Sequence, residues 1–408
     1  MFLSRTAVAL TMAAALCFAA RLDAQVTTGT FRGRITNTEG EPVVNAQVTV
    51  RNPSTGVERG TLTDASGRYL LPLIPPGAYT LRVHSIGFAA EERPNLQLSA
   101  GDVQAVDVQL TVQAVQLQAI EASAAAQRVD VAQTGVVQRV GAEQIENLPA
   151  NGRDFVDFLA LSALVSPQPE VGTGGQFAIG GARTSGTNIQ VDGADANNVF
   201  FGENRGSSRS PFTFSLESIR EFQLITNGWD VEFGNYQGGV MNAVTKSGTN
   251  DFSGSAFYFS RREGFTANDF NLIDPTDFTV HQFGASLSGP IRRDRLHFFA
   301  SVDGQERNQP TFAATASSAN VSETQRQAFL SALEAYGVAN PERYYGVFQQ
   351  TQDNLVLFGR LDWTLSGAHR LTLRQNYSNF EQENDRIASN EAVTGGGPFR
   401  DRVYSTVA

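Results

Sequence analysis

The sequence has 408 residues, of which 41% are hydrophobic and 18% charged, with 38 glycines, 28 phenylalanines and a formal net charge of −10. This acidic balance argues against a nucleic-acid partner, which would be expected to meet a basic face. Beyond the first 24 residues no apolar run reaches the roughly 18 residues that a membrane helix needs. Abundant glycine and phenylalanine, together with alternating segments, favour a mainly β fold.

Residues 1–24 have the pattern of a secretory signal peptide. Arg5 gives a charged start, an apolar run of 14 residues extends from Ala7 to Ala20, and Ala24 precedes the expected cut before Gln25. The single cysteine, Cys17, lies inside this segment. We therefore expect an exported mature chain without a disulfide framework, a zinc site or a thiol nucleophile.

Residues 26–112 carry short β-prone runs separated by turn signals, which predicts a β-sandwich of about seven strands. Ala46, Val48 and Val50 alternate with polar neighbours, as one buried face of a sheet requires. The ordered segments GRITNTEGEPVVNAQVTV, TDASGRYLLPLIPPGAYTLRV and SIGFAAEE resemble the carboxypeptidase-regulatory-like, transthyretin-like domain.

The sequence predicts no catalytic, cofactor or metal site. The only histidines lack the spacing of a zinc motif, so we interpret them as structural or exposed: His84, His281, His297 and His369. No grouping of nucleophile, base and orienting residue is evident, and the protein is not expected to be an enzyme.

Residues 113–127 are rich in alanine and glutamine and form a predicted linker. One interpretation is a plain connection. The other is a TonB box, because the segment resembles the short extended stretch through which TonB-dependent receptors pair with the periplasmic energiser TonB. Its contact residues would be Gln116, Leu117, Gln118, Ala119, Ile120 and Glu121.

Residues 128–250 mix helical and strand-like pieces and resemble the plug domain of TonB-dependent receptors, an α+β unit. A short amphipathic turn is expected over 141–149 and a helix from Arg153 to Leu164. The resemblance places plug-motif residues at Gly180, Gly181, Arg183, Asn188, Asp192 and Gly193, with Gly180 where arginine is common.

Three charged residues further along this region, Glu217, Arg220 and Glu221, are candidates for contacts between plug and barrel. A solvated polar face is the alternative interpretation. The segment VEFGNYQGGVMNAVTKSGTN at 231–250 then resembles the junction between plug and barrel. Its marked residues are Gly234, Gly238, Gly239 and Lys246.

Residues 251–408 alternate between apolar and polar side chains, which is typical of membrane barrel strands with lipid outside and a wet lumen inside. A soluble sandwich also alternates, so connection lengths have to help. Turns near 290 and 367 are short, whereas 304–354 and 381–399 are predicted long polar loops, the first with a small helix in ETQRQAFLSALEAYG.

About six strands fit into this region, against the 8 or more of bacterial membrane barrels, so we expect the N-terminal part of a longer receptor. The resemblance to TonB-dependent outer-membrane receptors of the Oar-like group implies ligand uptake by plug movement driven through TonB. Implied partners are TonB, outer-membrane lipid and an extracellular ligand that remains open among siderophore, cobalamin, saccharide and peptide.

The same resemblance implies a location in the outer membrane, with the sandwich and the linker in the periplasm. The alternative function is a secreted or surface-attached β-rich adhesion or glycan-binding protein, which would explain export and the sandwich without a barrel.

Overall fold

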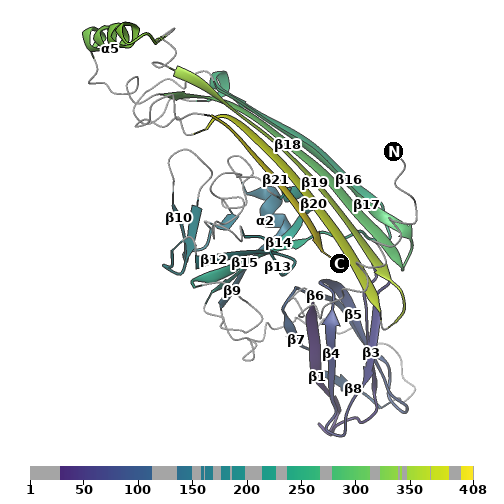
Figure 1. The fold of residues 1–408 in the computed structure, drawn as a ribbon. Coiled ribbons are helices and arrows are strands. Elements are labelled where there is room, and N and C mark those ends of the chain that lie inside the picture. The colour runs from purple at the N-terminus through teal and green to yellow at the C-terminus, as the bar shows by residue number, and fades with distance from the viewer. Residues whose placement is uncertain are drawn as a thin grey trace, which may run out of the picture.

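The computed structural model describes residues 28–112, 136–148, 158–159, 161–168, 176–183, 186–197, 214–226, 237–266, 278–312, 322–338, 341, 347–367, 369–385 and 397–407. A small sandwich lies at one end, a mixed unit lies in the middle, and a long curved sheet arches beside that unit (Figure 1). The predicted signal peptide and TonB box lie outside the described residues. The domain boundaries given above stay predictions.

The N-terminal unit consists of eight short strands: β1 (Gly29–Asn37), β2 (Gln47–Arg51), β3 (Glu58–Leu62), β4 (Arg68–Ile74), β5 (Gly77–His84), β6 (Glu91–Leu98), β7 (Val103–Ala105) and β8 (Val108–Leu110). One sheet has the order β4-β1-β7, with β8 also on β1, and the other has the order β3-β2-β5-β6. The predicted face of Ala46, Val48 and Val50 is fully buried, in one core with Phe31 and Leu81. The predicted sandwich is confirmed, and it has one strand more than the sequence indicated.

The middle unit contains β9 (Val136–Gly141), α2 (Ala142–Asn147), β10 (Val165–Gln168), β11 (Gln176–Ile179), β12 (Thr187–Val191), β13 (Ala194–Asp195), η2 (Leu216–Ser218), β14 (Ile219–Thr226) and β15 (Gly239–Thr245). Its main sheet has the order β13-β12-β15-β14-β9, and β10 pairs with β11 separately. A second core, which includes Phe177, Ile189, Phe222 and Met241, packs on this sheet. This mixed unit is called the plug below.

The helix predicted from Arg153 to Leu164 does not reach its predicted end. Residues 158–159 are helical, but Leu161 and Ser162 then donate backbone hydrogen bonds three residues back, and a strand begins at Val165. Tight turns of this kind keep Ser162 buried as a helix would. The burial pattern alone therefore did not distinguish the two conformations.

The C-terminal sheet has six antiparallel strands, each paired with the next in sequence: β16 (Ser253–Arg262), β17 (Thr279–Arg292), β18 (Leu296–Phe312), β19 (Val347–Thr364), β20 (Arg370–Asp385) and β21 (Gly397–Val407). The short helix η3 (Glu263–Phe265) follows β16, and α5 (Glu323–Ala335) lies between β18 and β19, where a helix was predicted. This unit is called the six-stranded sheet below.

The predicted strand ends in this sheet were wrong. The long connections cover 313–346 and 386–396, not 304–354 and 381–399, because polar residues such as Gln305 and Gln350 continue the strands on a buried face. The turn expected near 290 lies further along the chain, at 293–295, since β17 continues to Arg292. A shift in strand register between Pro290 and Arg292 accommodates the proline inside the ladder.

The two ends of the six-stranded sheet differ. The short turns at 293–295 and 365–369 lie toward the sandwich, whereas α5 lies at the far end (Figure 1). The connection lengths therefore follow the predicted asymmetry of short turns on one side and long loops on the other.

Candidate functional site at the interface of plug and sheet

The outward face of the six-stranded sheet is apolar and exposed. Neighbouring positions across four strands form one band, with exposed fractions of 37–53%: Phe283, Leu287, Val302, Leu355, Leu357, Leu361, Trp363, Leu371 and Leu373. Along β19 the band from Leu355 to Trp363 is about 27 Å long at roughly 3.4 Å per residue. An apolar belt on the outward face is what lipid requires of a tilted barrel strand.

The inward face carries polar side chains that are buried against the plug. Its polar members are less than 9% exposed: Gln282, Ser288, His297, Ser301, Asp303, Gln305, Gln350, Gln352, Asn354, Asp362, Arg374, Asn376, Ser378 and Gln382. Four buried apolar side chains lie among them: Phe299, Val356, Phe358 and Phe380. A soluble sandwich would bury the apolar face instead. The predicted arrangement of apolar side chains outside and polar side chains inside is confirmed.

A two-residue turn of the plug points at this polar face. Asp192 and Gly193 connect β12 to β13 and have φ angles of 47° and 77°. Left-handed values at both positions define a type I′ turn, for which Asp-Gly is a preferred pair. The turn is anchored on β15, because Gly193 N donates to Asn242 Oδ1 (3.0 Å) and Thr245 N donates to Asp192 Oδ1 (2.8 Å).

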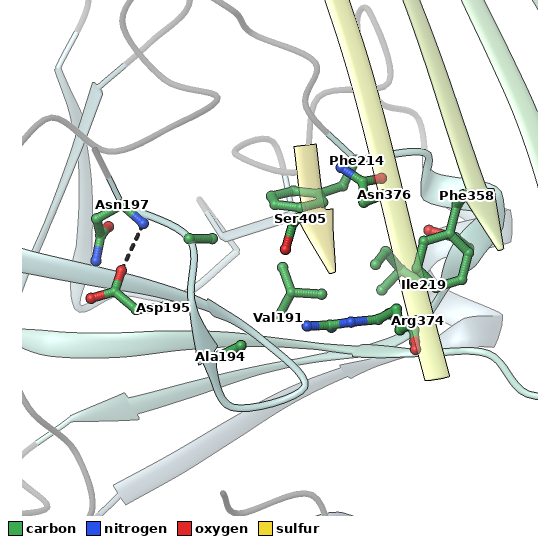
Figure 2. A pocket seen from close by; sticks show the side chains of 13 residues that line it. Val191, Ala194, Asp195, Asn197, Phe214, Ile219, Phe358, Arg374, Asn376 and Ser405 are labelled. Atoms are coloured by element: carbon green, nitrogen blue, oxygen red, sulfur yellow. Dashed lines mark hydrogen bonds between the residues drawn. The ribbon is translucent and has the colours of Figure 1, made fainter. Parts of the chain in front are cut away.

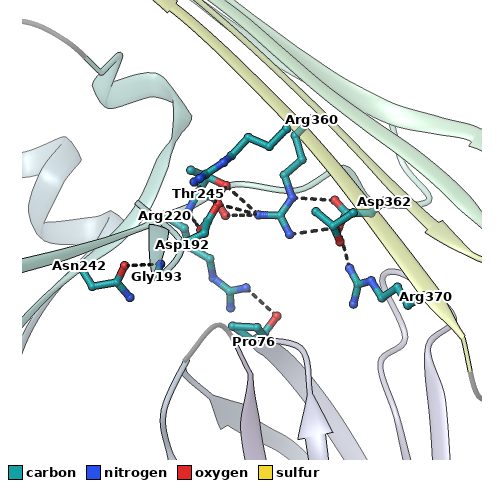
Figure 3. A network of polar contacts seen from close by, with 11 residues as sticks. Pro76, Asp192, Gly193, Arg220, Asn242, Thr245, Arg360, Asp362 and Arg370 are labelled. Carbon is teal, nitrogen blue, oxygen red and sulfur yellow. Dashed lines mark hydrogen bonds and ion pairs between the residues drawn. The ribbon is translucent and has the colours of Figure 1, made fainter. Parts of the chain in front are cut away.

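The Asp192 carboxylate meets two arginines of the six-stranded sheet. Arg374 Nη1 of β20 donates to Asp192 Oδ2 at 2.8 Å, and Arg360 Nη1 of β19 lies 3.7 Å from the same oxygen (Figure 3). Thr245 links Asp192 to Arg360, because its Oγ1 donates to Asp192 Oδ2 and accepts from Arg360 Nη1, both at 2.7 Å. Residues 182 positions apart in sequence are thus joined in one buried ion cluster.

Asp362 holds Arg360, together with Arg370, from the side of the sheet. Arg360 donates to it through Nε (2.8 Å) and Nη2 (3.0 Å), a bidentate pair, while Arg370 Nη2 and Thr372 Oγ1 each approach at 2.9 Å. The paired geometry fixes the guanidinium plane of Arg360, which then reaches across to the plug. Two carboxylates thus face three arginines, leaving the cluster one positive charge in excess.

Further contacts join the same two units. Ser215 Oγ donates to Asp303 Oδ2 of β18 at 3.0 Å, and Ser255 Oγ of β16 donates to Glu217 Oε2 at 2.7 Å. A cavity of about 200 Å³ lies beside the Asp192 turn, between the plug and strands β19 to β21. Figure 2 shows Val191, Phe214, Phe358, Arg374 and Ser405 around it. The interface therefore combines ion pairs, hydroxyl contacts and an unfilled volume.

The residues of the predicted plug motif fall into separate places. Asn188 is buried and accepts from Asn197 Nδ2 (2.7 Å), whereas Gly180, Gly181 and Arg183 lie on an exposed turn. Both glycines have positive φ, 62° and 76°, which suits glycine. Of the motif, only Asp192 belongs to the ion cluster, and Gly193 completes the turn that presents it.

The junction residues that the structure describes have packing roles. A Cβ added at Gly238 would lie 2.1 Å from the Ile179 carbonyl oxygen, and one at Gly239 would lie 2.5 Å from the Ile179 side chain. Lys246 lines a polar cavity of about 410 Å³ shared by the sandwich, the plug and the sheet. Gly234 is outside the described residues.

Two of the three predicted plug-to-barrel charges contact the sandwich instead. Arg220 Nη1 donates to the Pro76 carbonyl oxygen at 2.7 Å (Figure 3), and Glu221 accepts from Ser99 Oγ at 3.2 Å. Only Glu217 contacts the six-stranded sheet. Burial lowers the pKa of the Arg220 guanidinium, although the neighbouring Glu221 opposes the shift.

Arg360, Asp362 and Arg374 were missed by the sequence analysis. Each of them is a charged side chain at an inward-facing position of an alternating strand. That pattern could have marked them, because a lumen that contained only water would not require a particular charge at such a position.

Across the described ranges no helix is long and apolar enough to cross a membrane. Nor does any cluster of three His, Cys, Asp or Glu side chains suit a metal ion within the part of the chain that the structure covers.

Two protein families match parts of the sequence. The carboxypeptidase regulatory-like domain matches residues 30–111, and the outer membrane beta barrel domain matches residues 244–341. The TonB-dependent transporter Oar of Myxococcus xanthus is 32% identical over 277 residues, which are 64% of this chain and 25% of that protein. The chain thus spans about a quarter of the length of this curated relative.

Solved structures with a similar arrangement include the outer membrane transporter YddB of Escherichia coli, with 17% identity, coverage of 60% of this chain and 33% of that one, and a TM-score of 0.45. A ferric enterobactin receptor mutant of Pseudomonas aeruginosa has 15% identity, coverage of 67% of this chain and 38% of that one, and a TM-score of 0.44.

By its two family matches and its curated relative, the chain is an outer-membrane protein that joins a carboxypeptidase regulatory-like domain to an outer membrane beta barrel domain and is similar to a TonB-dependent transporter.

Proposed function

We propose that the chain is part of a TonB-dependent outer-membrane receptor that takes up an extracellular ligand by movement of the plug. The observation that carries this proposal is the buried ion cluster of Asp192, Arg360 and Arg374 between the plug and a sheet that is apolar outside. A plug held by charges can separate and be rehydrated, because each group regains water when the contact opens. An apolar contact would instead expose its surface to water at a cost of about 25 cal/mol per Å².

The same sheet supports an orientation of the chain in the membrane. Short turns of membrane barrels face the periplasm and long loops face outward, and the sandwich lies at the end with the short turns. The sandwich and the linker of 113–127 would then be periplasmic, where TonB acts. An extended box at Gln116–Glu121 would add to a sheet edge of TonB through its backbone.

The adhesion or glycan-binding alternative has no counterpart for the exposed apolar band. A soluble surface rarely keeps a contiguous apolar patch of this extent, and here the opposite face is the polar one. The proposal also involves no chemical step, in keeping with the relatives, which are transporters and receptors.

The test uses the full-length protein and the periplasmic domain of TonB, because the ligand is unidentified. Deleting Gln116–Glu121 should abolish binding of that domain, measured by biolayer interferometry on protein in detergent. A matched control deletes the next six residues, Ala122–Gln127, and should retain binding. Equal binding by both deletion variants would refute the box.

Transport needs a second measurement. Cells that carry the wild-type receptor should deplete a component of a mixed-solute medium, followed by mass spectrometry, and cells with the Gln116–Glu121 deletion should not. Normal outer-membrane insertion of both proteins, checked by membrane fractionation, is required for the comparison. Equal depletion by both would reject TonB-driven uptake.

A further inference from the structure

One loop of the sandwich, Ser99–Asp102, contacts the edge strand β9 of the plug sheet and its neighbour β14. Asp102 Oδ1 forms an ion pair with Arg139 Nη2 of β9. Gln223 Nε2 of β14 donates to the Ala100 carbonyl oxygen at 2.8 Å, and Ser99 Oγ donates to Glu221 Oε2 at 3.2 Å. A single loop therefore bridges β9 and β14 from outside the plug.

The contact is polar and only partly shielded. The side chains of Arg139 and Asp102 are 30% and 26% exposed, whereas Gln223 is 2% exposed and is held by Glu221 Oε1 at 2.8 Å. Partly exposed ion pairs open readily because both groups regain water. The buried amide of Gln223 supplies directionality, since its donor has to find another acceptor when the loop leaves.

Strand β9 has an exceptional position in the plug. It is an edge strand, paired only with β14 among the strands that the structure describes, over Val136 to Gly141. It is also the first plug strand after the connection of 113–135, and β8 of the sandwich is the last strand before it. The two strands that flank this connection thus belong to the two units that Asp102 and Arg139 join.

We propose that the sandwich acts as a latch on β9. While the latch is closed, the Ser99–Asp102 loop holds the edge strand against β14, so a pull on the connection has to break the contacts of this loop before β9 can leave. Opening the latch frees β9 to separate from β14. This inference rests on the proposed function for the origin of the pull, but the latch itself is a property of the resting protein.

The latch makes a prediction for hydrogen exchange that requires neither ligand nor TonB. In the full-length protein, Asp102→Asn and Arg139→Gln should each speed amide exchange in Val136–Gly141 roughly tenfold, because the edge strand loses a charged partner. Amides of β15, which lies inside the plug sheet, should keep their wild-type rates.

Two further variants separate the latch from general damage. The exchanged pair Asp102→Arg with Arg139→Asp should restore slow exchange in β9. Arg82→Gln removes an exposed sandwich ion pair with Glu92 and should leave β9 unchanged. Unaltered β9 exchange in both single variants, or no recovery in the exchanged pair, would overturn the proposal. Loss of TonB binding by the box deletion bears on the proposed function and leaves this result unaffected.

Discussion

The sandwich and the six-stranded sheet use the same alternation of side chains with opposite polarity. In β5 of the sandwich, Tyr79, Leu81 and Val83 are buried and the residues between them face water. In β19, Leu355, Leu357 and Leu361 are exposed, while Asn354 and Asp362 are buried. The period of two fixes which residues share a face, but only the surroundings decide which face is covered.

The largest expected effect lies in the core of the sandwich. Phe31→Ala removes a fully buried ring that packs edge-on against Tyr79, with ring centroids 5.8 Å apart. We expect a loss of about 3–5 kcal/mol in the free energy of unfolding of the sandwich. Hydrogen exchange of β1 in the full-length protein measures it, and unchanged protection of β1 would contradict a core at this site.

At the polar interface between plug and six-stranded sheet, charged contacts and not apolar packing should determine how tightly the two units are held together. Asp192→Asn keeps a residue suited to the type I′ turn but leaves Arg374, whose side chain is 5% exposed, without its carboxylate. We expect the plug to be held less tightly by about 3 kcal/mol. Proteolysis of the plug in detergent-solubilised protein should quicken, and an unchanged rate would show that the ion cluster contributes little.

The opposite polarity of the sandwich and the six-stranded sheet can be tested by making the same substitution, leucine to arginine, in both units. Leu357→Arg places a cation in the apolar band and should destabilise the protein folded in a bilayer by about 2 kcal/mol. The control, Leu70→Arg, changes a residue of the sandwich that is 58% exposed and should be neutral. Similar urea midpoints of refolding into vesicles for Leu357→Arg and wild type would contradict contact with lipid.

The smallest effect concerns alkaline pH and the sandwich alone. Burial, helped by the nearby Asp107 carboxylate, raises the pKa of Tyr69, whose hydroxyl donates to the Val106 carbonyl oxygen at 2.7 Å. An unfolded tyrosine ionises near pH 10. The contribution of protonated Tyr69 to the stability of the sandwich is therefore present below about pH 10 and is lost as pH rises further.

Replacing the hydroxyl checks that assignment. Tyr69→Phe should lower sandwich stability by about 1 kcal/mol at neutral pH and weaken its decline above pH 10. Tyr79, whose pKa burial also raises, should retain part of the decline. An identical alkaline profile for the variant and the wild type would exclude Tyr69 as the titrating group.

Much of the fold could be predicted because its determinants are local. Alternation located the strands and their faces, and Ser322 caps α5 by accepting from Gln325 N. Strand ends were missed because Gln305 and Gln350 are polar yet buried on the inward face. A run of polar residues indicates an exposed loop as readily as it indicates a strand with a buried polar face.

The site was less predictable because its partners are distant in sequence. Asp192 was singled out by resemblance, but nothing near it indicates Arg374, 182 residues away. Arg220 and Glu221 were predicted to contact the barrel, but their partners lie in the sandwich, more than 100 residues earlier. Composition shows that such charges exist, whereas only the three-dimensional arrangement assigns them to a surface.

The Asp-Gly turn separates shape from charge at a single position. Its backbone needs only a residue that tolerates a left-handed conformation, and asparagine and aspartate both do. An exchange between these two residues would keep the conformation of the turn and remove the carboxylate that two arginines and Thr245 contact. One substitution at this position would therefore change how firmly the plug is retained, without any alteration of the fold that presents it.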